Sequence, residues 1–451
     1  MHTKRLLAAS LLLPILAFGA CGGDDSSSTD GGKDVTTSDV TSTDGNGNDV
    51  APQDAGTDGN LSTCTKCTVT PCACDVVTTS SFACSLMSDG TVYCWGQRAG
   101  LNADGGLHSA QPEGPKPLAG LPKMKAIASG QGSVCAITTT NEAWCWGYDG
   151  SEQLGYDASA SGTAELYEPR PLPGASDVAQ IALSFATLCI RHSTGSVECM
   201  GEANNGQLGM GPNDGGIPPF KQTTLVPMLI RVDGGPDADV MPVTGVTEVA
   251  PGYFHACVLM GGNVLCTGNN ALYGNLGNTA VANRTLVLEP SYPVIGATGI
   301  ASLGRASTWH SCMEPTTGPL QCWGKNDLSE VAPIDAGNNV RTPYVWSSLP
   351  HMVTASASYA NTCAIDDTGS VWCWGRNDGM TSGKTDTSDP TPGKLTLGSK
   401  AVAVSIEGVG EPAYACAVLD TGEVDCWGDN SFLKLGRGSI AATPTPGPVK
   451  F

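Results

Sequence analysis

Cysteine is the residue type whose number and spacing most clearly indicate chemistry in this chain. Nineteen cysteines are present among 451 residues, and fourteen of them form seven pairs that are nine or ten positions apart. Cysteine pairs at this spacing are typical of disulfides or of metal sites, and a metal site would need four ligands from separate pairs to converge. We therefore predict seven local disulfides: Cys84–Cys94, Cys135–Cys145, Cys189–Cys199, Cys257–Cys266, Cys312–Cys322, Cys363–Cys373 and Cys416–Cys426.

Four further cysteines lie close together just before the first of these pairs. The stretch CTKCTVTPCAC contains Cys64, Cys67, Cys72 and Cys74. This spacing would suit a zinc knuckle in a cytosolic protein, whereas two local disulfides are expected in an exported one. We predict disulfides, and the sequence leaves all three connectivities open. Only Cys21 then remains, so no thiol is left over for catalysis.

The other residue types give little indication of catalysis. Beyond the N-terminal residues the histidines are scattered, at 108, 192, 255, 310 and 351, and the sequence has no serine nucleophile elbow and no phosphate-binding loop. Many acidic residues fall in predicted turns, where aspartate serves the turn itself. We therefore predict that the protein is not an enzyme and has no catalytic residue, cofactor or metal site. The alternative is a hydrolase built on the same fold.

The first residues predict export. Two basic residues precede an apolar run over 6–18, which is too short to span a bilayer comfortably, and small residues then lead into Cys21. This arrangement resembles a bacterial lipoprotein signal. The resemblance implies that residues 1–20 are removed and that Cys21 carries a lipid (palmitate) anchor. Gly22 does not match the aspartate signal for inner-membrane retention, so we expect the outer membrane or the cell surface. An ordinary secretory signal is the alternative.

The next segment, over 21–62, predicts a disordered tether. It is rich in Gly, Ser, Thr, Asp and Asn, and residues 22–60 contain nine Asp and one Lys, a net charge of −8. The whole chain has a formal charge of −20, and loss of Lys4 and Arg5 takes the mature form to −22. The folded part is therefore near −14. Nucleic-acid binding needs a basic face, so this balance argues against it.

Each cysteine pair predicts a β-hairpin. In CAIDDTGSVWCWG, pairing Cys363 with Cys373 leaves Asp367-Thr368-Gly369 as the loop, and a glycine in the third position supplies the left-handed conformation such loops need. Five other ten-residue copies place Gly or Asn at that position. The pair Cys257 and Cys266 is one residue shorter, and it leaves Gly261-Gly262, which suits a two-residue type I′ turn.

The hairpins recur with a regular period. Their first cysteines are 51 to 55 residues apart, except for one gap of 68. A period near 50 made of strands and turns predicts a β-propeller, and seven repeats of four strands would close a ring. We therefore predict an all-β protein with a seven-bladed β-propeller over 76–451, preceded by a small Cys-rich knot over 63–75 and by the tether.

The repeats share a tail that identifies a family. Cys-Trp-Gly stands at 94–96, 145–147, 322–324, 373–375 and 426–428, and several copies continue to Asn and Leu-Gly, as in GEANNGQLG from Gly201. These repeats resemble those of the regulator of chromosome condensation family, which implies a seven-bladed propeller. Cysteine at both hairpin positions resembles the exported bacterial branch of that family. Blades five and six depart from the tail, with Leu328-Ser-Glu-Val and Gly379-Met-Thr-Ser in place of Gly-Gln-Leu-Gly.

The resemblance also assigns roles to single residues. The family's histidine falls on His255 and His310, but other blades carry Phe, Ser, Thr, Asn or Tyr there, so we expect packing rather than catalysis. The recurrent tryptophans are expected to fill the space between blades, and the tail glycines to allow close backbone approach. Four tryptophans lie outside the recurrent position and are candidates for packing or for exposed contacts: Trp144, Trp309, Trp346 and Trp372.

Two segments are expected to have special roles. About 14 extra residues lie within 212–247, between blades three and four, and this insertion is the first candidate for a ligand-contacting element. The C-terminal residues 443–451 contain several prolines, and we expect them to pair with blade one as an edge strand that closes the ring.

A binding module fits these observations best. We predict a monomeric, lipid-anchored propeller that presents one rigid face to a protein ligand at the cell surface or in the periplasm. A polysaccharide or cell-wall ligand is the alternative, and the identity of the ligand is open. The acidic charge argues against the chromatin and GTPase functions of the family's name-giving member.

Overall fold

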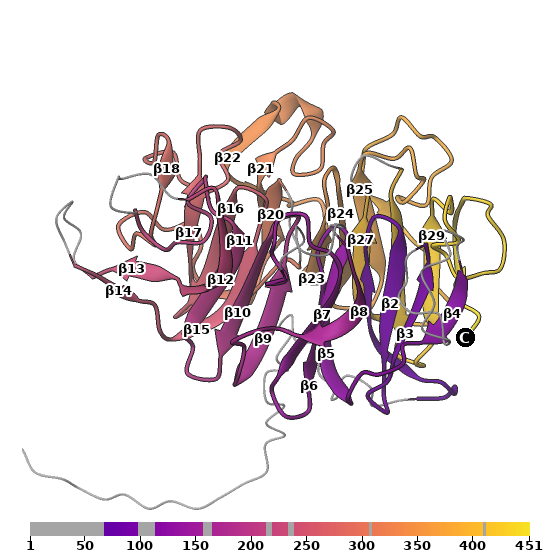
Figure 1. Cartoon of the computed structure of the whole chain (residues 1–451). Coiled ribbons are helices and arrows are strands. Elements are labelled where there is room, and N and C mark those ends of the chain that lie inside the picture. The colour runs from indigo at the N-terminus through magenta and orange to yellow at the C-terminus, as the bar shows by residue number, and fades with distance from the viewer. Residues whose placement is uncertain are drawn as a thin grey trace, which may run out of the picture. The chain divides into compact units, whose positions relative to one another are not determined.

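The structure is a computed structural model of the whole chain, and it describes residues 67–97, 113–156, 165–212, 219–232, 239–305, 309–408 and 412–451. These residues lie in one compact unit, over 54–451. They form seven four-stranded antiparallel sheets, the blades of a β-propeller, and one two-stranded sheet (Figure 1). The predicted fold class is confirmed.

Each blade uses four consecutive strands, numbered outward from the axis of the ring. The first three blades are β1 (Ala73–Thr78), β2 (Phe82–Met87), β3 (Val92–Gly96) and β4 (Glu113–Pro117); β5 (Met124–Ser129), β6 (Ser133–Thr138), β7 (Ala143–Tyr148) and β8 (Glu165–Pro171); and β9 (Val178–Leu183), β10 (Thr187–His192), β11 (Val197–Glu202) and β12 (Lys221–Pro227).

Blades four to seven follow the same order. They are β15 (Val246–Pro251), β16 (His255–Met260), β17 (Asn263–Asn269) and β18 (Arg284–Thr285); β19 (Ile300–Leu303), β20 (His310–Pro315), β21 (Gln321–Lys325) and β22 (Asn339–Val345); β23 (Met352–Ala357), β24 (Asn361–Asp366), β25 (Val371–Gly375) and β26 (Gly393–Lys394); and β27 (Ala401–Glu407), β28 (Tyr414–Leu419), β29 (Val424–Gly428) and β30 (Thr443–Pro448). A short 3-10 helix, η2 (Ile334–Ala336), precedes β22.

The predicted hairpin register is confirmed. Cys363 faces Cys373 across β24 and β25, and the corresponding cysteines face each other in the other six blades. All seven pairs are disulfide-bonded, with Cα atoms 4.0 to 4.1 Å apart. Gly369 has φ +84°, and Gly261 and Gly262 in the two-residue turn both have positive φ, as a type I′ turn requires.

The antiparallel order gives the propeller two different faces. In every blade the chain passes from the second to the third strand through a short hairpin turn. These turns lie together on what we call the turn face. The connections from first to second strand, and the longer ones from third to fourth strand, lie on the opposite side, the loop face. In Figure 1 the turn of β6 and β7 points down and the loop face is uppermost.

The Cys-rich segment lies against the turn face. Cys67 and Cys72 form a disulfide, and Cys74 is disulfide-bonded as well. Cys74 is part of β1, so the first strand begins inside the segment that the sequence assigns to the knot. Backbone hydrogen bonds join this segment to two turns: Ser88 N–H donates to Cys72 O, and Ala73 N–H donates to Gly422 O. Cys64 and Cys21 lie outside the described residues.

The predicted pairing of the C-terminal segment with blade one is wrong. β30 is hydrogen-bonded to β29 in blade seven, and the outer strand of blade one is β4. Every blade takes its outer strand from the residues that follow its own third strand. In blade one the outer strand, EGPKP, has no alternation of apolar and polar residues, and the sequence therefore gave no sign of it.

Side chains and single hydrogen bonds close the ring instead. Thr78 N–H of blade one donates to Ser405 Oγ of blade seven at 3.0 Å, and Trp95 Nε1 donates to Lys434 O at 2.7 Å. The C-terminal Phe451 packs edge-on against Trp95, with ring centroids 5.8 Å apart. The tail thus contacts blade one through its side chains although its strand belongs to blade seven.

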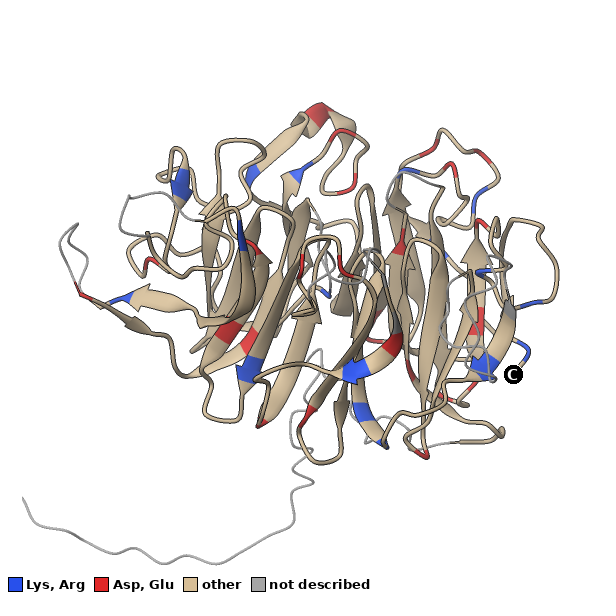
Figure 2. Ribbon diagram, in the orientation of Figure 1, with Lys and Arg blue, Asp and Glu red and all other residues tan. Residues whose placement is uncertain are grey.

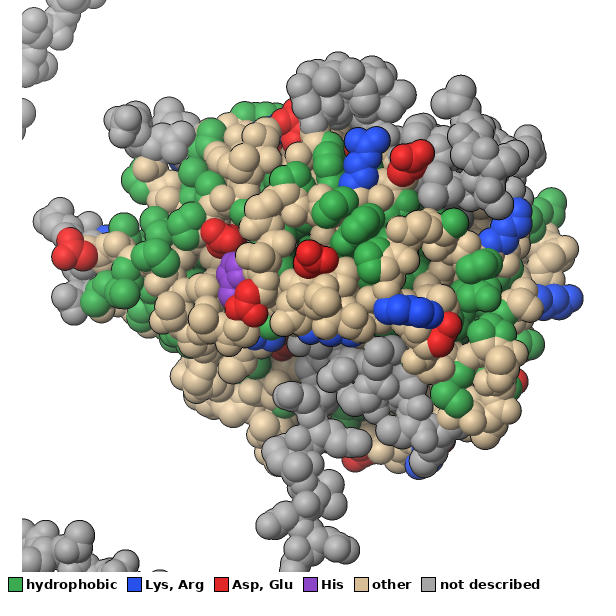
Figure 3. All heavy atoms as spheres, turned by 60° about the horizontal axis from the view of Figure 1, so that its bottom comes forward, with side chains coloured by type: hydrophobic (Ala, Val, Ile, Leu, Met, Phe, Trp, Pro, Cys, Tyr) green, Lys and Arg blue, Asp and Glu red, His purple; other side chains and the backbone are tan. Residues whose placement is uncertain are grey.

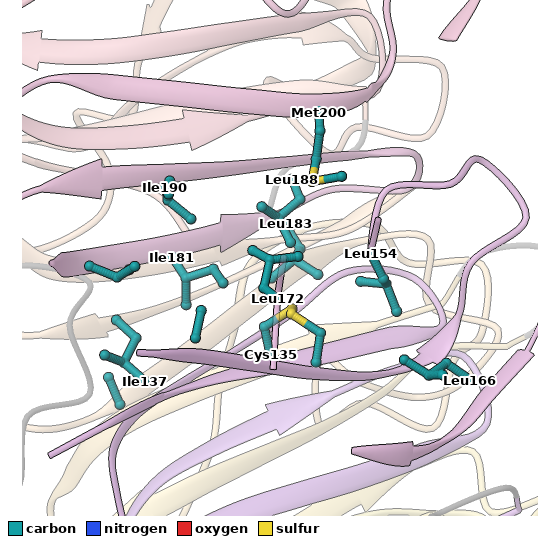
Figure 4. Close-up of a cluster of buried hydrophobic side chains, with 14 residues drawn as sticks. Cys135, Ile137, Leu154, Leu166, Leu172, Ile181, Leu183, Leu188, Ile190 and Met200 are labelled. Carbon is teal, nitrogen blue, oxygen red and sulfur yellow. A yellow bond between two sulfur atoms is a disulfide. The ribbon is translucent and has the colours of Figure 1, made fainter. Parts of the chain in front are cut away.

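Among the described residues the hydrophobic core is divided into seven clusters, each shared by two neighbouring blades. Figure 4 shows the cluster between blades two and three, which contains both the Cys135–Cys145 disulfide and Met200. In five other clusters the disulfide of one blade packs with the recurrent tryptophan of the next, and these tryptophans are at most 1% exposed: Trp95, Trp146, Trp323, Trp374 and Trp427.

The described loops between third and fourth strands share a left-handed residue near their start although their sequences differ. The family's tail has glycine at the fifth residue after the Trp-Gly glycine, and Gly206 has φ +83° there. Blades two, five, six and seven adopt the same left-handed conformation without glycine, at Glu152, Ser329, Met380 and Leu433, with φ between +56° and +63°. The divergent tails of blades five and six are therefore changes of sequence and not of loop geometry.

Ser329→Gly is expected to stabilise the protein by about 1 kcal/mol. Ser329 is strained by its positive φ of +63°, and its buried Oγ has no hydrogen-bond partner among the described residues. The matched control is Gly274→Ser, the left-handed glycine six residues after Gly268 in the same loop of blade four, where a Cβ would lie 2.6 Å from Arg341 Cα. Thermal denaturation should show a higher Tm for the first variant and a lower one for the second. A lower Tm for Ser329→Gly would contradict this view of the loops.

Candidate functional site

Aromatic side chains gather on the loop face, over blades three to six. We call this group the aromatic surface, and it is formed by Phe185, Tyr253, Phe254, Tyr273, Trp309 and Tyr359. All six side chains are half-buried, so each leaves part of its ring accessible. Five of them lie between the first and second strands of their blades, and Tyr273 lies between the third and fourth strands of blade four.

The rings form one continuous network. Tyr253 and Trp309 are stacked with planes 8° apart and centroids 5.5 Å apart, and Trp309 meets Tyr359 edge-on at 5.1 Å. Phe185 extends the network to blade three through an edge-on contact with Tyr253 at 4.7 Å. Edge-on and stacked aromatic pairs each add about 0.5–1.5 kcal/mol beyond burial. The surface is therefore preorganised across four blades.

A buried lysine supports this surface from below. Lys325 Nζ lies 4.5 Å from the ring centroid of Tyr359 and 5.7 Å from that of Trp309. The same ammonium pairs with Asp327 at 2.9 Å and with Glu330 at 3.3 Å. Burial acts to lower the pKa of Lys325, but the two carboxylates outweigh it and raise the pKa. Lys325 therefore stays charged beneath the rings.

The repeat pattern shows why the sequence hid most of this site. The position four residues before the first cysteine of each hairpin is Phe185, Tyr253 and Tyr359 in blades three, four and six. It is Ser80 and Gln131 in blades one and two. The aromatic residues are thus not part of the repeat. Of the six residues, the sequence indicates only Trp309 as a candidate contact residue, because it lies outside the recurrent tryptophan position. A position-by-position comparison of the seven repeats is the signal that would have found the others.

The structure places both family histidines between blades. His255 Nε2 is hydrogen-bonded to Ser311 Oγ at 2.6 Å, and His310 Nε2 to Thr362 Oγ1 at 2.8 Å, so each joins its blade to the next. Burial lowers the pKa of His255 to about 4 and that of His310 to about 3. Both are neutral at physiological pH and inaccessible. Among the described residues, no cluster of three or more His, Cys, Asp or Glu is arranged to hold a metal ion.

The other tryptophans outside the recurrent position have mixed roles. Trp346 is 4% exposed and packs against Trp374, with centroids 5.3 Å apart. Trp372 is half-buried, donates through Nε1 to Asp366 at 3.0 Å, and lies under Lys394. Trp144 is also half-buried and packs at the edge of the core between blades one and two. Of the four, only Trp309 belongs to the aromatic surface.

The insertion between blades three and four forms a projecting arm. Its strands β13 (Leu229–Arg231) and β14 (Val240–Pro242) pair with each other, and the arm extends to the left in Figure 1. Arg231 Nε pairs with Glu289 at 3.0 Å and so holds the arm to blade four. Val232 and Met241 are about half exposed, at 51% and 49%. Ligand contact by this arm stays a prediction.

Charge is dispersed over the described surface. Figure 2 shows acidic and basic residues interspersed along the blades, and Figure 3, which brings the turn face forward, shows charged side chains scattered among neutral and apolar ones. Neither view shows a basic face of the kind that nucleic-acid binding needs. No helix among the described residues is long and apolar enough to cross a bilayer.

Two stretches of the chain match a known repeat. Residues 73–98 and 353–379 match the family model described as regulator of chromosome condensation (RCC1) repeat. The chain is 24% identical over 375 residues to the ultraviolet-B receptor UVR8 of Arabidopsis thaliana, a match that covers 80% of this chain and 77% of UVR8. It is 25% identical over 379 residues to the human E3 ubiquitin-protein ligase HERC2, but that match spans only 7% of HERC2.

Solved structures show the same architecture. Human WBSCR16 is similar with a TM-score of 0.62 and 19% identity, covering 80% of this chain and 94% of that one. Yeast RCC1 (Prp20), in its complex with Kap60, is similar with a TM-score of 0.61 and 20% identity, covering 80% and 83%. At these identities the structures establish the propeller fold and leave the ligand of this chain open.

Lys325→Met is expected to lower the free energy of unfolding by about 3 kcal/mol, because it leaves the buried Glu330 carboxylate without its partner. Glu330→Gln installs the residue that blades two and three carry at this position, Gln153 and Gln207. The double variant should recover about 2 kcal/mol of the loss in urea unfolding. If the losses in free energy of unfolding of the two single variants simply added in the double variant, Lys325 and Glu330 would not be coupled.

Proposed function

We propose that this propeller of RCC1-type repeats is a non-catalytic binding module whose aromatic surface docks a protein partner. The observation that carries the proposal is the concentration of six aromatic side chains on one side of the loop face, at positions where the repeat itself does not require them. Loops on a rigid scaffold are the usual place for binding residues.

The chemistry of the surface favours a protein ligand. Tyrosine and tryptophan bury a large area at a small cost in side-chain entropy, and they dominate the energetic centres of protein interfaces. The rings are already fixed by one another and by Lys325, so little ordering is needed on binding. Related propellers also bind proteins: yeast Prp20 was crystallised with Kap60 and studied for binding to Gsp1p and histones.

Export and lipid anchoring belong to the same proposal. A disulfide in every one of seven hairpins suits an oxidising compartment. The Cys-rich segment contacts the turns of the propeller on the side opposite the aromatic surface, and the proposed anchor on Cys21 lies outside the described residues. We propose a monomer held at the outer membrane or the cell surface in this way.

Trp309→Ala and Tyr359→Ser are expected to weaken partner binding at least tenfold each. The replacements are residues that other blades carry at the same positions, Ala360 in blade six and Ser80 in blade one, so the loops should keep their fold. The immobilised chain captures its partner from an envelope extract of the source cells, mass spectrometry identifies it, and calorimetry measures each affinity.

The control for this experiment is Tyr292→Ala, an aromatic residue that is 42% exposed and lies outside the aromatic surface. It should leave the affinity unchanged, and all variants should keep the parent Tm. Equal affinity of the parent and both surface variants would refute the proposal. Capture of glycan fragments in place of a protein would favour the polysaccharide alternative.

Cys21→Ala is expected to release the protein from the membrane fraction, because a stable anchor depends on the acyl chains that this cysteine would carry. Metabolic labelling with a fatty acid should mark the parent chain and not the variant. Membrane association that persists in the unlabelled variant would show that something other than a lipid on Cys21 retains the chain.

A further inference from the structure

A small cavity lies on the axis of the ring, and one charged side chain enters it. The cavity has a volume of about 40 Å³ and is lined by residues of all seven blades. Arg305, which follows the inner strand of blade five, is the one charged residue among its described lining. The strand register places uncharged residues at this position in the other blades: Thr78, Ser129, Leu183, Pro251, Ala357 and Ile406. The repeat therefore does not require a charge here.

The guanidinium of Arg305 reaches across the ring to blade one. Its Nη1 lies 2.7 Å from Oδ1 of Asp75, which is on the inner strand β1, and blades six and seven separate blade five from blade one. Asp75 is fully buried, and its carboxylate also accepts the N–H of Val76 at 2.9 Å. A charge-assisted hydrogen bond has a defined geometry, so Asp75 is a fixed point that holds the Arg305 side chain.

The backbone of Arg305 is bonded to the inner strand of blade six. Its N–H and its carbonyl oxygen form hydrogen bonds with β23, at 2.8 and 3.1 Å. Tyr359 comes two residues after the end of β23, and Trp309 comes four residues after Arg305, with 306–308 outside the described residues. Arg305 is therefore placed where the two chain segments that lead to Trp309 and Tyr359 come together.

We propose that Arg305 is a positioning residue for the aromatic surface, an inference that rests on the binding function proposed above. Asp75 holds its guanidinium on the far side of the ring, and its backbone joins the segments from which Trp309 and Tyr359 extend. The ion pair acts through these two rings, whose edge-on contact at 5.1 Å requires the segments to stay side by side. Its loss should change the packing of Trp309 and weaken partner binding although no contact residue is altered.

The test separates positioning from stability. Arg305→Met leaves the buried Asp75 carboxylate without its partner and should lower the Tm. Adding Asp75→Asn removes that charge, so the double variant should recover most of the Tm. The double variant still lacks the anchor, so the Trp309 signal should stay shifted in fluorine NMR of the full-length chain labelled with fluorotryptophan, with Trp309→Ala assigning the signal. Its affinity for the captured partner should stay about tenfold below that of the parent.

The control variant is Arg231→Met, which breaks an ion pair of similar exposure with Glu289 in the arm and should leave the Trp309 signal unchanged. An unshifted Trp309 signal in the double variant, or a shifted signal with full partner affinity, would overturn the positioning role. The NMR comparison needs no partner. Failure of Trp309→Ala to weaken partner binding would instead refute the binding function, so the two failures are distinguishable.

Discussion

The close approach of two cysteines in each hairpin is the constraint on which the rest of the propeller depends. A disulfide between directly opposed residues fixes the register of the second and third strands, with Cα atoms 4.0 to 4.1 Å apart. Side chains alternate along a strand, so the register that turns Cys373 to one face of its blade turns Trp374 to the other. Each disulfide can then pack against the tryptophan of the next blade, and the ring grows by one repeated contact.

A scaffold fixed in this way leaves its loops free to differ. The inner strands add contacts between blades, for example the two hydrogen bonds between the Gln180 amide and Val249 of the next blade. The loops between third and fourth strands tolerate Glu152, Ser329 and Leu433 in a left-handed conformation because the surrounding blades hold them there. Aromatic residues can therefore gather over a few blades without cost to ring closure, as they do in the aromatic surface.

The sequence predicted the repeated part of the structure better than the single features. Cysteine spacing and turn glycines such as Gly369 act locally, so hairpins, register and blade number followed from them. The closure of the ring did not, because it depends on contacts such as Trp95 with Lys434, which are 339 residues apart. The aromatic surface was missed for the same reason. Tyr253, Trp309 and Tyr359 become neighbours only when three blades stand side by side.

The junction between the first and last blades is also the place where the Cys-rich segment attaches to the ring. Here no strand of the described residues is exchanged between the two ends, so the junction relies on side-chain packing, on hydrogen bonds such as that from Thr78 to Ser405, and on the Cys-rich segment beneath it. That segment is hydrogen-bonded to the turns of blades one and seven through Ser88 and Gly422, on the face opposite the aromatic surface. A pull on the N-terminus would therefore act on the turn face at this junction. Among the described residues the loop face carries no part of that connection, and its aromatic rings stay partly accessible.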